Sequence, residues 1–373
     1  MERRIGRRIG ALLICMLWPV TVMAQGQRQQ PLEAVAQNIG CAYEELLTSE
    51  KLVPGEPVSD WMAIATGCSG DPVKRNAYLQ GLEDYVTRQY ANNGGLHRIK
   101  ATEWHRISLA ILALGGDPTV FGKDAINLIA DGTYNFQMAD SLGLQGLNGW
   151  IFALITLDAA AYEVPENARF TREDMLREIL SAQTEDGGFG LSGSSADVDI
   201  TAMALQALAP YCAENAEVAA AADRALDWLA AQQNENGGFT SWGSAAAEGT
   251  AQTVIALCSL GIDPRTEERF IKNGNSPVDG LMQYQTEDGM FRHTLDSEAD
   301  IMATEQAALA LIALDRLDRS GRRLYDLTDV AVYQGSDDTA PKEGTGPMLW
   351  IIIGTVTAAA AVALAVKGRK KHV

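Results

Sequence analysis

Two aspartates, Asp197 and Asp199, stand two residues apart at the start of an apolar segment that runs to Leu208. A carboxylic acid placed in this way can act as a general acid in catalysis. Carboxylates also favour the start of a helix, because the first turn exposes free backbone N–H groups and carries partial positive charge. The pair therefore supports two interpretations, a catalytic acid or a helix start, and the surrounding elements must decide between them.

The segments around the pair repeat along the chain. The pattern Gln-x-x-x-Gly-x-Phe occurs at residues 183–189, 233–239 and 285–291, and a weaker copy begins at Tyr90. Repetition at a fixed period is the signature of a fold built from copies of one unit. We interpret the repeated residues as structural, since glycine permits unusual turn angles, the amide satisfies backbone groups and phenylalanine packs beneath.

Each unit continues with a short polar residue and then an apolar segment of helical length. These polar residues are Ser59, Thr102, Asn148, Thr201, Thr250 and Thr304. Their side chains can accept a hydrogen bond from a free amide in the first helical turn, so we predict that they cap six helices. The six helices are apolar on nearly all sides, which predicts that they are buried.

Amphipathic segments alternate with the apolar helices and are predicted as an outer layer. They span residues 32–47, 74–90, 123–130, 171–183, 217–232 and 266–284. An open array of such units would expose apolar helices at its ends unless it were capped, whereas closure into a ring hides them. The pattern therefore favours two concentric layers of helices.

The repeated turns and the Thr-Ala helices resemble the prenyltransferase and squalene-cyclase repeat over residues 32–326, most closely over 180–315. The resemblance implies an all-α fold, an (α/α)6 toroid of six outer and six inner helices, which we assign to residues 25–327. Related toroids serve as terpene cyclases, protein prenyltransferase subunits, thioester domains and cobalamin carriers. The fold alone therefore does not define a function.

The resemblance gives the aspartate pair a specific role to test. Residues 197–202 are similar to the Asp-x-Asp-Asp-Thr-Ala signature of terpene cyclases, which would make Asp199 the acid that protonates an alkene, but Ile200 replaces the last aspartate. A carbocation also needs a preorganised aromatic site, and only 7% of the residues are aromatic. We expect a binding module rather than an enzyme. The alternative is a terpene cyclase-like enzyme that uses Asp199, with Asp197, on a polyprenyl substrate.

The inner helices of a toroid run parallel, so their N-termini should form a single mouth. Tryptophans at equivalent positions of three helices predict an aromatic wall with an acidic rim, suited to a small molecule. The predicted ligand-binding residues are Trp61, Trp104, His105, Trp150, Asp197, Asp199, Glu248 and Glu305. The structural alternative is that the acids complement helix starts and the tryptophans fill the core. No zinc motif occurs, and we expect no metal and no cofactor.

Both ends of the chain carry apolar segments. Four arginines precede the first of them, which predicts a secretory signal peptide at residues 1–24. Residues 348–366 carry no charge and precede a basic tail at 367–373, which predicts a transmembrane helix with a cytoplasmic C-terminus. Residues 328–347 would be a linker. The prediction is a single-pass cell-membrane protein of bacterial type, with the toroid outside the cytoplasm.

The chain is acidic, with 48 Asp and Glu against 30 Lys and Arg and a formal charge of −18. Such a surface repels phosphate backbones, so nucleic acid is not expected as a partner, and an unknown small molecule or surface protein remains. Cys41, Cys68, Cys212 and Cys258 are too few for a disulfide scaffold. Cys41 and Cys68 are the first pair to test, and buried free thiols are the alternative.

Overall fold

The computed structural model describes residues 40, 42–70, 74–193, 195–241 and 243–330. Residues 42–48 are helical, and the helices that follow are α2 (Pro57–Cys68), α3 (Arg75–Asn93), α4 (Thr102–Ala113), α5 (Leu128–Gly132), α6 (Asn148–Ala159), α7 (Arg172–Ser181), α8 (Val198–Leu208), α9 (Ala216–Gln232), α10 (Ala247–Ser259), α11 (Pro277–Met282) and α12 (Ile301–Ser320). Two 3₁₀ segments, η1 (Ala209–Tyr211) and η2 (Glu268–Phe270), lie between them. Two antiparallel hairpins pair β1 (Thr240–Ser241) with β2 (Ser244–Ala245) and β3 (Phe291–Arg292) with β4 (Ala299–Asp300).

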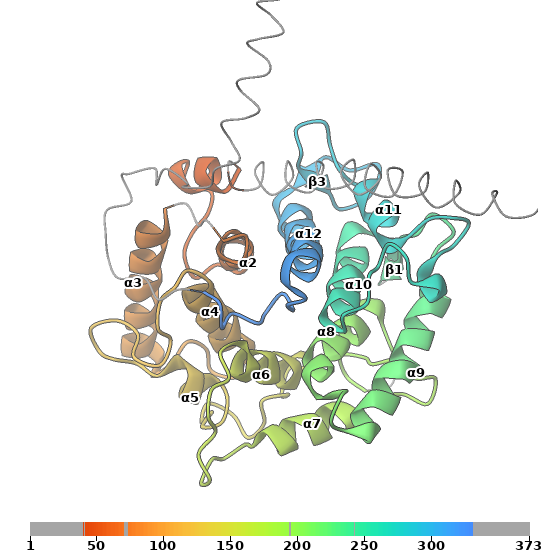
Figure 1. Cartoon of the computed structure of the whole chain (residues 1–373). Helices are drawn as coiled ribbons and strands as arrows, with labels where there is room; N and C mark the ends of the chain where they lie inside the picture. The colour runs from red at the N-terminus through yellow and green to blue at the C-terminus, as the bar shows by residue number, and fades with distance from the viewer. Residues whose placement is uncertain (1–39, 41, 71–73, 194, 242, 331–373) are drawn as a thin grey trace, which may run out of the picture. The chain divides into compact units, whose positions relative to one another are not determined.

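Six helices form a closed inner ring (Figure 1). Helix α2 packs against α4, α4 against α6, and the series continues through α8 and α10 to α12, which packs back against α2. Helices α3, α5, α7, α9 and α11 lie outside this ring. The inner helices are buried on nearly all sides; in α6, ten of the twelve residues are buried. The prediction of a mostly helical toroid is confirmed for the described residues.

The outer helices bury only one stripe. In α7, Met175 and Ile179 face the ring four residues apart, while a capping box between Thr171 and Asp174 fixes the start of the helix. The outer helices α5, α7 and α11 are shorter than the predicted segments 123–130, 171–183 and 266–284. Between residues 266 and 284 only α11 and η2 are helical, because Asn273 and Gly274 adopt positive φ in a tight turn and Ser276 starts a new helix.

The repeated turns tie neighbouring units together. Gln183 donates from Nε2 to the carbonyl oxygen of Gly187 in its own turn at 2.8 Å and to that of Ala221 in α9 at 2.8 Å. Gln233 makes the equivalent pair of hydrogen bonds to Gly237 and to Phe270. The φ of Gly187 is 98° and that of Gly237 is 87°, a region that disfavours a β-carbon. The structural interpretation of the turns is confirmed.

The prediction that Thr201 and Thr304 cap their helices is wrong. Each lies inside its helix, and an aspartate four residues earlier is the cap: Asp197 accepts from the Ile200 amide at 2.9 Å, and Asp300 accepts from the Ala303 amide at 2.8 Å. The other four predicted caps also lie inside their helices: Ser59, Thr102, Asn148 and Thr250. A buried polar residue near a helix start has the same sequence signature as a cap.

The inner threonines instead hold the repeated turns. Thr201 and Thr250 accept from the backbone N–H of Phe189 at 2.8 Å and of Phe239 at 3.1 Å. Thr304 does the same for Phe291 at 2.9 Å. Each buried amide thereby gains a partner, which avoids the cost of an unsatisfied polar group. The threonine therefore links turn to inner helix in every strong repeat.

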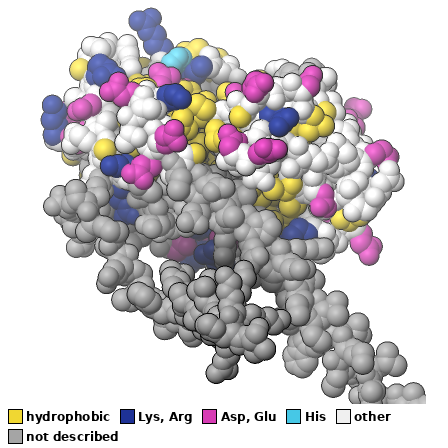
Figure 2. Space-filling view, turned by 90° about the horizontal axis from the view of Figure 1, so that it is seen from above, with side chains coloured by type: hydrophobic (Ala, Val, Ile, Leu, Met, Phe, Trp, Pro, Cys, Tyr) yellow, Lys and Arg dark blue, Asp and Glu magenta, His cyan; other side chains and the backbone are white. Residues whose placement is uncertain are grey.

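The predicted signal peptide at residues 1–24, the predicted transmembrane segment at 348–366 and the basic tail lie outside the described residues. Among the helices that the structure describes, none combines the length and the apolar character needed to cross a membrane. On the face shown in Figure 2, acidic and basic side chains are interspersed with small apolar areas.

Candidate binding site in the centre of the ring

A cavity of about 400 Å³ lies at the N-terminal ends of the inner helices. All six inner helices contribute to its wall, which confirms that their starts face one space. The lining residues are Trp61, Thr102, Arg106, Asn148, Phe152, Asp199, Ile200, Met203, Gln252, Gln306 and Leu309, with Leu191 and Tyr325 from connecting segments. The volume lies in the range of pockets that hold small organic ligands.

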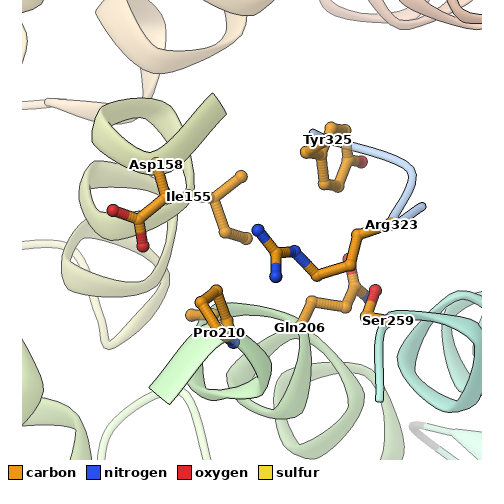
Figure 3. A pocket seen from close by; sticks show the side chains of 8 residues that line it. Ile155, Asp158, Gln206, Pro210, Ser259, Arg323 and Tyr325 are labelled. Atoms are coloured by element: carbon orange, nitrogen blue, oxygen red, sulfur yellow. The ribbon is translucent and has the colours of Figure 1, made fainter. Parts of the chain in front are cut away.

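Residues 322–330, here called the floor segment, close the ring on the side of the helix C-termini. The chain leaves α12 at Gly321, and the floor segment runs across the ring, in blue in Figure 1. Leu324, Tyr325 and Leu327 are buried. Tyr325 lines the central cavity and also a much smaller one of about 20 Å³ at the opposite end (Figure 3). The floor segment therefore separates the two cavities.

Hydrogen bonds from the inner helices hold the floor segment in place. Arg316 of α12 donates from Nη2 to the carbonyl oxygen of Asp326 at 2.5 Å and to the carboxylate of Asp329 at 3.0 Å. The Leu327 amide donates to the carbonyl oxygen of Ala159, at the end of α6, at 2.8 Å. The floor segment thus joins helices on opposite sides of the ring.

Figure 3 shows the far side of the floor. Arg323 extends from the floor segment toward Ile155 and Asp158 of α6, with Gln206 and Ser259 nearby. The C-terminal ends of the inner helices carry partial negative charge, so a cation is favourable here. Asp158 is already bound to Arg172 at 2.9 Å. The geometry on this side is explained by helix charge and packing.

Arg106 lines the central cavity, and two carboxylates already bind its guanidinium. Its Nε donates to Asp60 at 2.9 Å, and its Nη2 donates to Glu103 at 2.7 Å and to the carbonyl oxygen of Gly55 at 3.0 Å. Asp60 is fully buried and also accepts from the Tyr78 hydroxyl at 2.7 Å. Burial raises the pKa of the Asp60 carboxyl, and the cluster places one guanidinium between two carboxyl groups.

Amide side chains form a hydrogen-bonded row along α8, α10 and α12, in which Gln252 and Gln306 line the cavity. Gln206 donates to Gln252 at 2.8 Å, Gln252 donates to Gln306, and Gln306 donates to Glu305 at 2.8 Å. Glu305 is 1% exposed and does not line the cavity. Burial raises the pKa of its carboxyl well above the usual range, which favours the protonated form.

The structure gives the two aspartates of the sequence motif different positions. Asp197 caps α8, and burial raises the pKa of its carboxyl. Asp199 lines the cavity, and its Oδ2 accepts from the Ser241 hydroxyl at 2.7 Å. A β-carbon at Gly249 would lie 3.2 Å from Oδ1 of Asp199, so glycine leaves room for this carboxylate against α10. Asp199 is the carboxylate that the cavity can use.

Trp61 forms an aromatic corner of the cavity. Its ring lies 5.5 Å from that of Phe152 and 6.4 Å from that of Tyr325. Sequence reasoning did not select Phe152, Arg106 or Tyr325. Helix register could have identified Phe152 and Arg106, because both, like Trp61, are the fifth residue of their helix. Tyr325 lies beyond the last repeat and carried no such signal.

Trp104 and Trp150 do not line the cavity, although both match Trp61 in the sequence repeat. Each is the third residue of its helix, and a shift of two residues rotates a side chain by about 200°. Trp104 is 1% exposed and donates to the Tyr90 hydroxyl at 2.9 Å. Trp150 packs edge-on against Phe170 at 5.3 Å. Both fill the space between inner and outer helices.

His105 and Glu248 also lie away from the cavity lining. His105 is buried beside the carbonyl oxygen of Gly132 at 2.7 Å, and burial lowers its pKa to about 4. Glu248 contacts His293 at 2.9 Å near the start of α10. Within the described part of the chain, no three His, Cys, Asp or Glu side chains could hold a metal ion. Of the eight residues predicted to bind ligand, the structure brings Trp61 and Asp199 together in one cavity.

Comparison with known proteins places this geometry in a class. Residues 194–314 match the family model of the squalene-hopene cyclase C-terminal domain, and residues 133–218 match that of the prenyltransferase alpha-alpha toroid domain. These matches confirm the resemblance stated from the sequence. The chain contains an α/α toroid of the prenyltransferase and squalene-cyclase repeat type.

A solved structure supports the same fold. Candida albicans protein geranylgeranyltransferase-I complexed with GGPP is similar with a TM-score of 0.52 and 12% sequence identity. The match covers 75% of this chain and 91% of that chain. At this identity the likeness concerns the fold. No curated protein sequence matches the chain.

Proposed function

We propose that this chain is an extracytoplasmic, membrane-anchored toroid that binds a small amphipathic molecule in its central cavity. The observation that supports the proposal is that the cavity wall has an apolar side and a polar side. Trp61, Phe152 and Tyr325 provide an apolar side, and Gln252 and Gln306 provide a polar side. Such a pocket buries the apolar part of a ligand and orients its polar part by a few hydrogen bonds.

The location rests on the two ends of the chain. Arginines followed by an apolar run support secretion, and the uncharged residues 348–366 followed by basic residues support a single membrane anchor. The floor segment ends shortly before this anchor in the sequence. A ligand in the cavity would therefore bind close to the membrane surface.

A matched pair of variants tests binding in the cavity. Met203 lines the cavity, whereas Met302 is 50% exposed on α12. Met203→Trp should narrow the cavity and obstruct a ligand, while Met302→Trp adds the same side chain to the surface. Native mass spectrometry of the full chain, extracted with its surrounding lipid from the source membrane, should detect a bound small molecule in wild type and Met302→Trp but not in Met203→Trp. Equal occupancy in all three, or in none, would refute the proposal.

A terpene cyclase-like enzyme is the second candidate. It is favoured by one observation: Asp199 lines the cavity and lies within the segment that matches the squalene-hopene cyclase model. The amides of Gln252 and Gln306 argue against it, because polar groups would capture a carbocation. If the full chain converts squalene and Asp199→Asn abolishes the conversion, catalysis replaces binding as the function.

A further inference from the structure

We propose that the ligand of the central cavity is an uncharged or cationic amphiphile, and that the cavity rejects anionic head groups such as phosphate. This inference rests on the proposed binding function and names the chemical class of the ligand. It follows from the charges that surround the cavity, taken together with the helix starts that face it.

The cavity offers no uncommitted cation among its described lining residues. A phosphate or diphosphate site requires positive charge that can face the ligand. Arg106 is the cation in the described lining, and its Nε and Nη2 atoms already bind Asp60 and Glu103. A phosphate approaching Arg106 would meet two carboxylates within 3 Å of the guanidinium, at 2.9 and 2.7 Å. The two carboxyl groups therefore compete with an anion for this guanidinium.

The helix N-termini would favour an anionic ligand, but carboxylates of the chain already supply negative charge there. Free amides at the start of a helix attract negative charge. Five of the six inner helices carry an acidic residue at the cap or in the first turn: Asp60 in α2, Glu103 in α4, Asp197 and Asp199 in α8, Glu248 in α10 and Asp300 in α12. The attraction of the helix starts for a further anion is therefore reduced.

The rest of the cavity wall suits a ligand that carries a hydrogen-bond donor or a positive charge. Asp199 presents a carboxylate, which accepts hydrogen bonds and attracts an ammonium group. The aromatic corner around Trp61 adds a surface over which a cation is stabilised by the ring electrons. An alkyl or isoprenoid chain would pack against Phe152 and Leu309, which also line the cavity. These contacts define an amphiphile with a hydroxyl or ammonium head group.

Three probes with one apolar chain test the preference: octylammonium, octanol and octyl phosphate. The full chain is placed in nanodiscs of neutral phosphatidylcholine, so that the lipid adds no net charge. Trp61 fluorescence is isolated by subtracting the signal of Trp61→Phe, which confines the readout to the cavity. Octylammonium and octanol should bind at least tenfold more tightly than octyl phosphate. Asp199→Asn should reduce the ratio between octylammonium and octyl phosphate at least threefold, while Glu166→Gln, at an exposed site, should leave it unchanged.

The outcomes distinguish a failure of the proposed charge preference from a failure of the proposed binding function. Octyl phosphate binding as tightly as octylammonium, or more tightly, would overturn the charge preference while leaving binding in the cavity intact. A preference that Asp199→Asn does not change would overturn the role of the cavity wall in setting it. If none of the three probes alters Trp61 fluorescence while the mass spectra of wild type and Met203→Trp agree, the binding function itself fails.

Discussion

Asp197 and Asp199 differ in role because only Asp199 belongs to the helix. Asp197 is the N-cap of α8, with extended backbone, and its side chain turns back onto the Ile200 amide, whereas Asp199 in the first turn lines the cavity. Glu305 and Gln306 differ by helix register, since Gln306 lines the cavity and Glu305 is buried and does not. At the scale of the residue, helix register decides which polar group meets a ligand.

Glu305 should make stability depend on pH. Burial raises its pKa in the folded state, so between its ordinary pKa of about 4.3 and the folded value the carboxyl binds a proton in the native state and loses it on unfolding. Stability is therefore full below the ordinary pKa and falls as the pH rises toward the folded pKa. Glu305→Gln resembles the protonated carboxyl and should remove this loss.

Thermal unfolding at two pH values measures the effect. At about pH 7.5, Glu305→Gln should raise Tm by about 2 °C or more, and at about pH 4 it should change Tm little. Glu166→Gln removes an exposed carboxylate and should show no such difference. A lower Tm of Glu305→Gln at the higher pH would show that the native state needs the ionised carboxylate.

The elements of the ring were predictable in number and order but not in rotation. The repeated turns and apolar segments placed all six inner helices correctly along the chain. Because these helices are buried on nearly all sides, hydrophobicity gave no sign of which side faces the centre. For this reason Trp104 and Trp150 were predicted to join Trp61, and Phe152 and Arg106 were missed. The floor segment lies after the last repeat and had no periodic signal at all.

Arg316 should be important for docking of the floor segment. Arg316→Gln removes a charged donor that binds the carbonyl oxygen of Asp326 and the carboxylate of Asp329. Loss of these partly buried hydrogen bonds should cost about 2 kcal/mol in the free energy of unfolding. It should also increase proteolysis within residues 322–330.

Urea unfolding and limited proteolysis check this prediction, with Arg319→Gln as the matched control. Arg319 pairs with Asp315 on the exposed face of the same helix, and its loss should cost about 0.5 kcal/mol or less. Equal destabilisation by the two variants would contradict the role of Arg316 in holding the floor.

At the scale of the whole molecule, the toroid is a fold that hosts different activities, so the function must be inferred from the cavity wall. The likeness to a geranylgeranyltransferase concerns the fold. We propose that Gln252, Gln306 and the paired Arg106 suit an uncharged or cationic ligand better than a diphosphate.

Two arginines in the predicted anchor should release the protein. Ile353→Arg with Val356→Arg places charges in the middle of residues 348–366, at about 2.5 to 3.5 kcal/mol each for a helix centre in the bilayer. The double variant should move from the membrane fraction to the soluble fraction after centrifugation. The same two substitutions to leucine should leave the protein in the membrane. Retention of the arginine variant would contradict the anchor.

The most direct test of the central claim is an experimental density map of the full chain purified from its source membrane. We predict density for a small molecule between Trp61, Phe152 and Gln306, with its apolar part against the aromatic corner and its polar part toward the amides and Asp199. Met203→Trp should remove this density without moving the inner helices. A map in which ordered water or the protein's own side chains fill the same space in the wild-type chain would contradict the account.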